Sequence, residues 1–137
     1  MTDVHSPKIR SYNMSRIRSK DTKPELIVRK YLFSKGFRYR LHLKKLPGKP
    51  DIVLPKYKTV IFIHGCFWHG HEYCKYFVVP KTRTDWWLKK IESNKQNDVE
   101  NIIKLQNLSW KVLVIFECQL KTSELENTLN KLINELY

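Results

Sequence analysis

The chain has 137 residues, which is enough to bury the core of one domain without disulfides, and we predict a single domain over residues 1–137. Hydrophobic residues make up 42% of the sequence and aromatic residues 12%, which excludes a wholly disordered chain. The formal net charge of +13 is uneven, because residues 1–49 hold 14 Lys and Arg against 3 Asp and Glu. This asymmetry predicts a basic face whose first candidate partner is nucleic acid, although some basic proteins bind no polyanion at all.

The first segment, residues 1–20, is basic with scattered apolar side chains, and we expect it to form a short helix or an arm. Its first ten residues lack the apolar core of a signal peptide. No apolar run in the chain reaches the roughly 18 residues that span a bilayer. We therefore expect a protein of the reducing cytoplasm that has no membrane partner.

A helix is predicted to begin at Thr22, because Thr22 and Glu25 have the spacing of a capping box, and to end at Gly36. Short strands are predicted to follow over residues 37–43, 51–54 and 59–63, where β-branched and alternating apolar residues are frequent. Residues 65–76 then form a loop rich in glycine, cysteine, histidine and aromatic residues.

A long helix is expected from Thr84 or Asp85 to about residue 108, with a buried stripe of Leu88, Ile91, Val99, Ile102 and Leu105. Residues 110–116 are almost continuously apolar, which is typical of a buried central strand. A last helix follows a second capping box, Ser123 to Glu126. Helices that flank a mixed sheet make the expected fold class α/β.

The loop HGCFWHGHEYC, residues 64–74, holds three of the five histidines and two of the three cysteines of the chain. Together with Cys118, its residues Cys66, His71 and Cys74 form a Cys₃His set, which suits a tetrahedral structural Zn²⁺ site. Free cysteines are also often ordinary buried residues. His69 is close enough in sequence to take the place of His71 as a ligand.

Asp51 begins a short predicted strand whose neighbour ends at Ile63 and His64. A carboxylate in this position can hold Mg²⁺ against a phosphate, and a backbone carbonyl of the second strand can supply another oxygen. Asp51 is equally compatible with a turn or a strand edge. Lys49 and Arg40 can neutralise phosphates, or they can be solvated charges.

Two histidines, His64 and His69, remain once the zinc ligands are assigned. Imidazoles near a metal-bound water suit general acid and base catalysis at neutral pH, but both can also serve as hydrogen-bonding residues of the metal loop. Glu25 has a simpler explanation as the capping partner of Thr22.

Aromatic residues cluster in and after the loop, at Phe67, Trp68, Trp86 and Trp87. On a metal-braced loop of a basic protein, such side chains can stack on bases or wedge between base pairs. For Trp86 and Trp87 the alternative is that at least one of them packs in the core.

These segments resemble one family, the very short patch repair DNA mismatch endonucleases. The resemblance is carried by VIFIHGCFWHGHEYC, by LPGKPDIVLP before it, and by VPKTRTDWWLKKI and WKVLVIFEC after it. The N-terminal SYNMSRIRSKDTKPE is also similar to the opening of that family. The likeness extends over roughly residues 5–120, in order and nearly without gaps.

The resemblance implies a fold related to type II restriction endonucleases, a structural zinc, and Mg²⁺-dependent nicking of the thymine-bearing strand of a T:G mismatch in double-stranded DNA. It implies that Asp51, His64, His69 and Glu25 are active-site residues, that Asp51 and the backbone carbonyl of Ile63 bind Mg²⁺, and that Cys66, His71, Cys74 and Cys118 bind zinc. Phe67, Trp68 and Trp87 would insert beside the mismatch from the major groove. Met14 and Ile17 would enter the minor groove. Mismatch-repair accessory proteins are candidate partners, and we expect a monomer, because nicking one strand needs one active site.

The sequence departs from the family pattern at two positions. Ile63 stands where the family can have threonine, which is harmless if that position contributes only its carbonyl. Glu72 and Tyr73 put two residues between His71 and Cys74, one more than in some relatives. Two further hypotheses stay open: a sequence-directed nuclease on the same scaffold, and a zinc-stabilised nucleic-acid-binding module without catalysis.

Overall fold

The computed structural model describes residues 22–71, 74–75 and 77–136. The predicted N-terminal arm, with Met14 and Ile17, lies outside the described residues. Within those described ranges, no helix is both long enough and apolar enough to cross a membrane.

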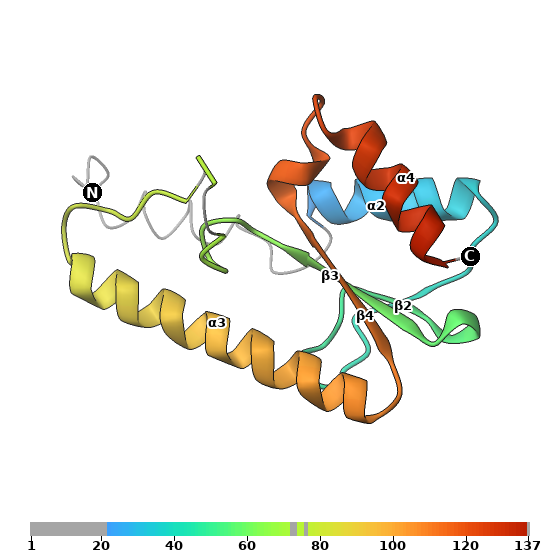
Figure 1. Cartoon of the computed structure of the whole chain (residues 1–137), viewed down its shortest axis with the longest axis horizontal. Helices are drawn as coiled ribbons and strands as arrows, with labels where there is room; N and C mark the ends of the chain where they lie inside the picture. The colour runs from blue at the N-terminus through green and yellow to red at the C-terminus, as the bar shows by residue number, and fades with distance from the viewer. Residues whose placement is uncertain (1–21, 72–73, 76, 137) are drawn as a thin grey trace, which may run out of the picture.

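A four-stranded mixed sheet forms the centre of the described structure (Figure 1). It consists of β1 (Arg40–Leu41), β2 (Ile52–Leu54), β3 (Thr59–His64) and β4 (Lys111–Phe116), in that spatial order. The β1–β2 and β2–β3 pairs are antiparallel, and β3 and β4 are parallel. A parallel pair needs a crossover connection, which the loop and the long helix between β3 and β4 provide.

In the part of the chain that the structure describes, three helices cover the two faces of the sheet (Figure 1). Helices α2 (Lys23–Ser34) and α4 (Leu125–Leu136) lie on one face, and α3 (Thr84–Asn107) lies on the other. Two 3₁₀ turns, η1 (Pro55–Tyr57) and η2 (Glu117–Leu120), follow β2 and β4. The predicted α/β class, a mixed sheet flanked by helices, is confirmed.

Each face of the sheet has its own core, because successive side chains of a strand point to opposite faces. Ile52, Leu54 and Ile61 pack with α2 and α4, in a cluster that includes Val28, Leu32, Leu129 and Leu132. Val53, Val60 and Phe62 pack with Leu105 of α3 on the other face. This double burial fixes where β2 begins and where β3 ends, and these are the points at which the polar site is built.

The prediction that residues 110–116 form a central strand is wrong for the sheet of the described residues, because β4 lies at its edge and pairs there with β3 only. Its side chains are apolar in succession because helices cover both faces of the sheet, not because strands lie on both sides of it. The predicted strand 37–43 is also shorter than expected, since only Arg40 and Leu41 pair with β2.

Both capping boxes are wrong as well. Thr22 precedes α2 but makes no side-chain capping hydrogen bond, and α4 begins at Leu125, two residues after Ser123. In α3, Leu88 is 48% exposed and Val99 is 56% exposed, so the predicted stripe holds only at its other members. The helix is long, and its first turns extend past the sheet (Figure 1).

The contrast within α3 predicts a difference in stability. Leu105→Ala removes a fully buried side chain and should lower the free energy of unfolding by about 2–5 kcal/mol. Leu88→Ala, in the same helix, should lower it by less than about 1 kcal/mol. Urea denaturation of both variants in one buffer measures the two values, and equal losses would contradict this placement of α3.

Candidate functional site

A cavity of about 1030 Å³ opens where β2 begins and β3 ends. Residues from the start of α2, from the β1–β2 connection, from the loop after β3 and from the middle of α3 line it. Its titratable lining residues include Glu25, His42, Asp51, His64, His69 and Asp98. The cavity therefore gathers the predicted acid and base residues and adds two that the sequence analysis did not select, His42 and Asp98.

Asp51 is anchored to the end of β3. Its Oδ2 accepts a hydrogen bond of 2.7 Å from the backbone N–H of Ile63. Burial, together with the neighbouring Glu25 carboxylate, raises the pKa of the Asp51 carboxyl to about 7, while the Ile63 hydrogen bond opposes the rise. The carboxyl thus titrates near neutral pH, which is unusual for an aspartate and typical of functional sites.

Glu25 does not cap α2. Its Oε2 accepts a buried hydrogen bond of 3.0 Å from Nη2 of Arg29, one turn along the helix. His42 Nε2 lies 3.4 Å from the same carboxylate oxygen, and His42 Nδ1 lies 4.0 Å from Oδ1 of Asp51. Glu25 therefore lines the cavity, where its carboxylate contacts Arg29 and His42 instead of serving only as a helix cap.

His64 and His69 stack face to face, with ring centroids 3.8 Å apart and planes 3° from parallel. Burial, together with the neighbouring His69, lowers the pKa of His64 to about 4, so His64 is neutral at pH 7. His69 Nδ1 lies 2.6 Å from Oδ2 of Asp98. A carboxylate at this distance fixes the orientation of an imidazole and leaves its Nε2 to exchange a proton.

The loop that carries His69 packs tightly against α3. Gly70 has a positive φ of 56°, and a Cβ there would lie 2.7 Å from a side-chain carbon of Ile91. The Asn94 side chain also donates a 2.9 Å hydrogen bond to the backbone carbonyl of Trp68. Only glycine allows this close approach at a positive φ, and the approach brings His69 to Asp98.

The sequence position of Asp98 could have predicted its place in the site. It lies midway between Ile91 and Leu105, seven residues from each, so the three side chains share one face of α3. Ile91 and Leu105 are both buried. A carboxylate on the inward face of a helix needs a partner, and that requirement marks it as a site residue. His42 left no comparable pattern.

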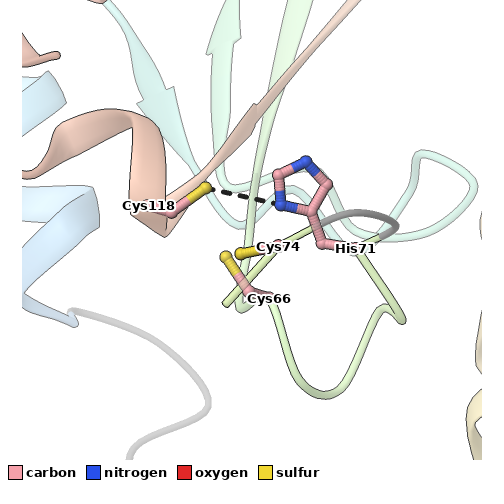
Figure 2. A group of neighbouring side chains, drawn as sticks. All are labelled: Cys66, His71, Cys74 and Cys118. Carbon is pink, nitrogen blue, oxygen red and sulfur yellow. Dashed lines mark hydrogen bonds between the residues drawn. The ribbon is translucent and has the colours of Figure 1, made fainter. Parts of the chain in front are cut away.

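A second cluster joins the loop to η2. Cys66, His71, Cys74 and Cys118 converge, and their ligand atoms lie within 4.8 Å of one another (Figure 2). The Sγ of Cys118 is 3.4 Å from Nδ1 of His71, and Cys66 is fully buried. Burial raises the pKa of the Cys66 thiol to about 12 and also raises that of Cys118. These four side chains could hold a metal ion.

The structure separates the two histidines between which the sequence could not choose. His71 faces the thiols and stacks on Phe116, with ring centroids 3.9 Å apart, whereas His69 faces Asp98. Within the described ranges, two more groups have ligand atoms close enough to share an ion: Glu25, His42 and Asp51 form one, and His64, His69 and Asp98 form the other.

The aromatic residues form an exposed ridge next to the cavity. Phe67, Trp68 and Trp87 contact one another with ring centroids 5.3–5.8 Å apart, and Trp86 meets Trp87 edge-on at 4.8 Å. Trp68 is 39% exposed and Trp86 is 46% exposed, and Trp87 is only partly buried. Neither Trp86 nor Trp87 is a core residue, so the alternative that one of them packs in the core is wrong.

Comparisons with known proteins agree with one another. A family model described as "DNA mismatch endonuclease Vsr" matches residues 2–75. The chain is 50% identical to the type II nicking enzyme V.NmeAIP of Neisseria meningitidis, over 99% of this chain and 97% of that protein. It is 45% identical to the DNA mismatch endonuclease Vsr of Escherichia coli, over 90% of this chain and 79% of that protein.

The raised pKa of Asp51 predicts how stability depends on pH. Between its ordinary value of 3.8 and about 7, the unfolded chain has lost this proton and the folded chain keeps it, so stability falls as pH rises through that window. Asp51→Asn removes this penalty. With no divalent cation added, the variant should gain about 2–3 kcal/mol over the original protein between pH 5 and pH 8. Denaturant titrations at both pH values measure the gain, and a constant difference would refute the shift.

Proposed function

Since the chain belongs to the Vsr family of DNA mismatch endonucleases, we propose that it nicks the thymine-bearing strand of a T:G mismatch, 5′ of the thymine, with Mg²⁺ as cofactor. The mismatch would arise by deamination of 5-methylcytosine, and the nick would begin very short patch repair. Because the substrate is double-stranded DNA, we propose that the enzyme works where a bacterium keeps its DNA, in the cytoplasm.

One observation carries this proposal. A single cavity holds a metal-binding carboxylate, Asp51, together with an oriented imidazole, His69 on Asp98. Exposed aromatic side chains lie beside it, and Lys44 and Lys49 are among its lining residues. Hydrolysis of a phosphodiester needs a cation, a proton carrier and charges that neutralise the phosphate, and the side chains of this cavity could bind the first and supply the other two.

The residues around Asp51 fit Mg²⁺, which prefers oxygen ligands. In an extended strand the N–H and C=O of one residue point toward the same neighbouring strand. The Ile63 N–H donates to Asp51, so the Ile63 carbonyl also points toward the side on which Asp51 lies. The β2–β3 register, continued from Ile52 opposite Ile61, sets Pro50 opposite Ile63. Proline has no N–H to donate to the Ile63 carbonyl, so this oxygen can serve as the second ligand of the metal. In that case the side chain of Ile63 plays no part in metal binding. When bound, Mg²⁺ would polarise the phosphate and lower the pKa of a water.

The histidines would divide the work between proton transfer and positioning. His69, held at Nδ1 by Asp98, would carry the proton at Nε2, either from the attacking water or to the leaving 3′ oxygen. His64 is neutral at pH 7 and stacks on His69, so we assign it to hold that ring in place. Glu25, buried beside Asp51, would act on the site through its charge.

The cysteine cluster fits Zn²⁺. Three thiolates and one imidazole are the donor set of a closed, tetrahedral structural site. Bound there, zinc would tie the loop after β3 to η2 after β4, and His69 lies between two of its ligands in the sequence. The two residues between His71 and Cys74 do not prevent these ligands from converging.

The exposed aromatic residues would supply the recognition of the mismatch. A T:G wobble stacks less well than a correct pair, so a wedge of Phe67, Trp68 and Trp87 opens the duplex at least cost there. We propose that Met14 and Ile17 enter from the opposite groove. A single set of these candidate catalytic side chains lies in the cavity of the described residues, which is consistent with a monomer that cuts one strand. Mismatch-repair proteins are candidates for accessory partners.

A second candidate function is sequence-directed nicking of matched DNA. Two of the most similar relatives, from Neisseria meningitidis and Xanthomonas oryzae, are named type II nicking enzymes, and those names do not specify a mismatch. The chain is 49% identical to the second, over 88% of each protein. A binding module without catalysis remains the third hypothesis.

A strand-specific nicking assay separates the three functions. Duplexes of one sequence that contain T:G or T:A, labelled in turn on each strand, are incubated with Mg²⁺ or with a chelator. We expect a nick only in the thymine-bearing strand of the T:G duplex and only with Mg²⁺. Equal cutting of both duplexes would favour the sequence-directed nuclease.

The control for this assay is Asp51→Asn, which keeps the size of the side chain. It should bind the T:G duplex normally in a gel-shift measurement and lose at least about 100-fold in nicking rate, because the metal loses its charged ligand. If the original protein binds T:G DNA and never nicks it with Mg²⁺, the binding module is the correct function.

A further inference from the structure

Arg29 lies between two side chains that could otherwise bind a metal. Its Nη2 is 3.0 Å from Oε2 of Glu25 and 3.1 Å from Nε2 of His42. The Arg29 side chain is only 10% exposed and that of Glu25 only 3%. One nitrogen with two hydrogens thus contacts both groups, away from most of the solvent.

The chemistry of the guanidinium fixes the state of His42. A guanidinium only donates hydrogen bonds, so in the 3.1 Å contact with Arg29 the Nε2 of His42 is the acceptor, and a neutral ring then carries its proton on Nδ1. The Glu25 carboxylate lies farther from the same nitrogen, at 3.4 Å, and an Nε2–H donated to it would lose the contact with Arg29. The Nδ1–H faces Oδ1 of Asp51 across 4.0 Å, which is too long for a direct hydrogen bond and leaves room for a bridging atom. Neither nitrogen of His42 then offers a lone pair to a metal ion.

The backbone conformation of His42 indicates that its position beside Asp51 is held by the fold. Its φ is 48°, in the left-handed region that non-glycine residues rarely adopt, and its N–H donates to the backbone carbonyl of Asp51 at 3.4 Å. Strained conformations of this kind persist where the surroundings hold them, and they cluster at functional sites. The chain therefore places the imidazole beside Asp51 while Arg29 occupies its accepting nitrogen.

We propose that Arg29 sets the metal selectivity of the catalytic site. Glu25, His42 and Asp51 have ligand atoms within 4.8 Å of one another, a set of two carboxylates and an imidazole that suits transition metals as well as magnesium. By holding Glu25 and His42, Arg29 leaves Asp51 as the side-chain ligand, and a site of oxygen ligands and water favours Mg²⁺. This inference rests on the proposed function, because it takes Asp51 as the ligand of the catalytic metal.

The tautomer of His42 tests the first step without any metal at that site. Nitrogen-15 NMR of the imidazoles, at pH 8 in the full chain with no divalent cation added, should show His42 protonated on Nδ1 only. In Arg29→Met the proton should become free to occupy Nε2. A doubly protonated ring, or one protonated on Nε2, in the original protein would overturn the proposal, and this measurement needs no variant to fold.

Metal titrations test the second step. Calorimetry of zinc-loaded protein with CoCl₂ and with MgCl₂ should show that Arg29→Met binds Co²⁺ about 10–100-fold more tightly than the original protein does. The gain in Mg²⁺ affinity should be smaller, because magnesium gains a carboxylate and loses a repelling charge but does not favour imidazole. An equal gain for both ions would show that Arg29 acts by its charge alone and would overturn the selectivity role.

The matched control is the double variant Arg29→Met/His42→Gln. It also lacks the guanidinium but replaces the imidazole, so the excess gain for Co²⁺ should vanish while the gain for Mg²⁺ remains. If Co²⁺ still binds more tightly in the double variant, His42 is not the ligand that Arg29 withholds. Cobalt–thiolate absorption bands would reveal any exchange at the cysteine cluster.

These outcomes differ from a failure of the proposed function. If the original protein does not nick T:G duplexes, the function is wrong whatever Co²⁺ does. If it nicks them with Mg²⁺ but Arg29→Met gains no Co²⁺ affinity, the function stands and the role assigned to Arg29 is wrong.

Discussion

The hydrogen bond from the Ile63 N–H to the Asp51 carboxylate ties the beginning of β2 to the end of β3, and the polar site is arranged around it. Both strands are buried on both faces by helices, so their ends have little freedom to move. The carboxyl is held where burial and a second carboxylate raise its pKa to about 7. Without a cation, this arrangement disfavours the charged form of Asp51 at neutral pH. A cation bound there would offset the unfavourable negative charge of the carboxylate.

Two carboxylates so close together require compensation, and the structure treats them differently. Glu25 receives the guanidinium of Arg29 from its own helix, whereas Asp51 accepts the backbone N–H of Ile63 and faces the cavity. On the other side of the cavity, Asp98 orients His69, and His64 stacks on that ring in its neutral form. One carboxylate is therefore paired with a guanidinium, one faces the cavity and one orients an imidazole, and the cysteine cluster forms a separate group.

Much of this arrangement could be predicted from the sequence, and the failures have physical reasons. Periodicity located the three described helices and the four strands, because burial on one face of an element leaves a local pattern. It placed β4 at the centre of the sheet, since an apolar strand looks the same whether helices or strands surround it. The clustering of Cys66, His71, Cys74 and Cys118 followed from residue type and spacing. His42 and Arg29 were missed because only the fold brings them together, whereas Asp98 had the buried face of its helix as a signal.

The two metal sites that we propose differ in chemistry, one being structural and the other catalytic. Anomalous scattering from crystals of the protein soaked in MnCl₂, with data at the zinc and manganese absorption edges, would locate both metals. We expect a zinc peak among the three cysteines and His71, and a separate manganese peak beside the Asp51 carboxylate and the Ile63 carbonyl. Manganese in the cysteine cluster, or a soaked crystal with no peak beside Asp51, would contradict this proposal.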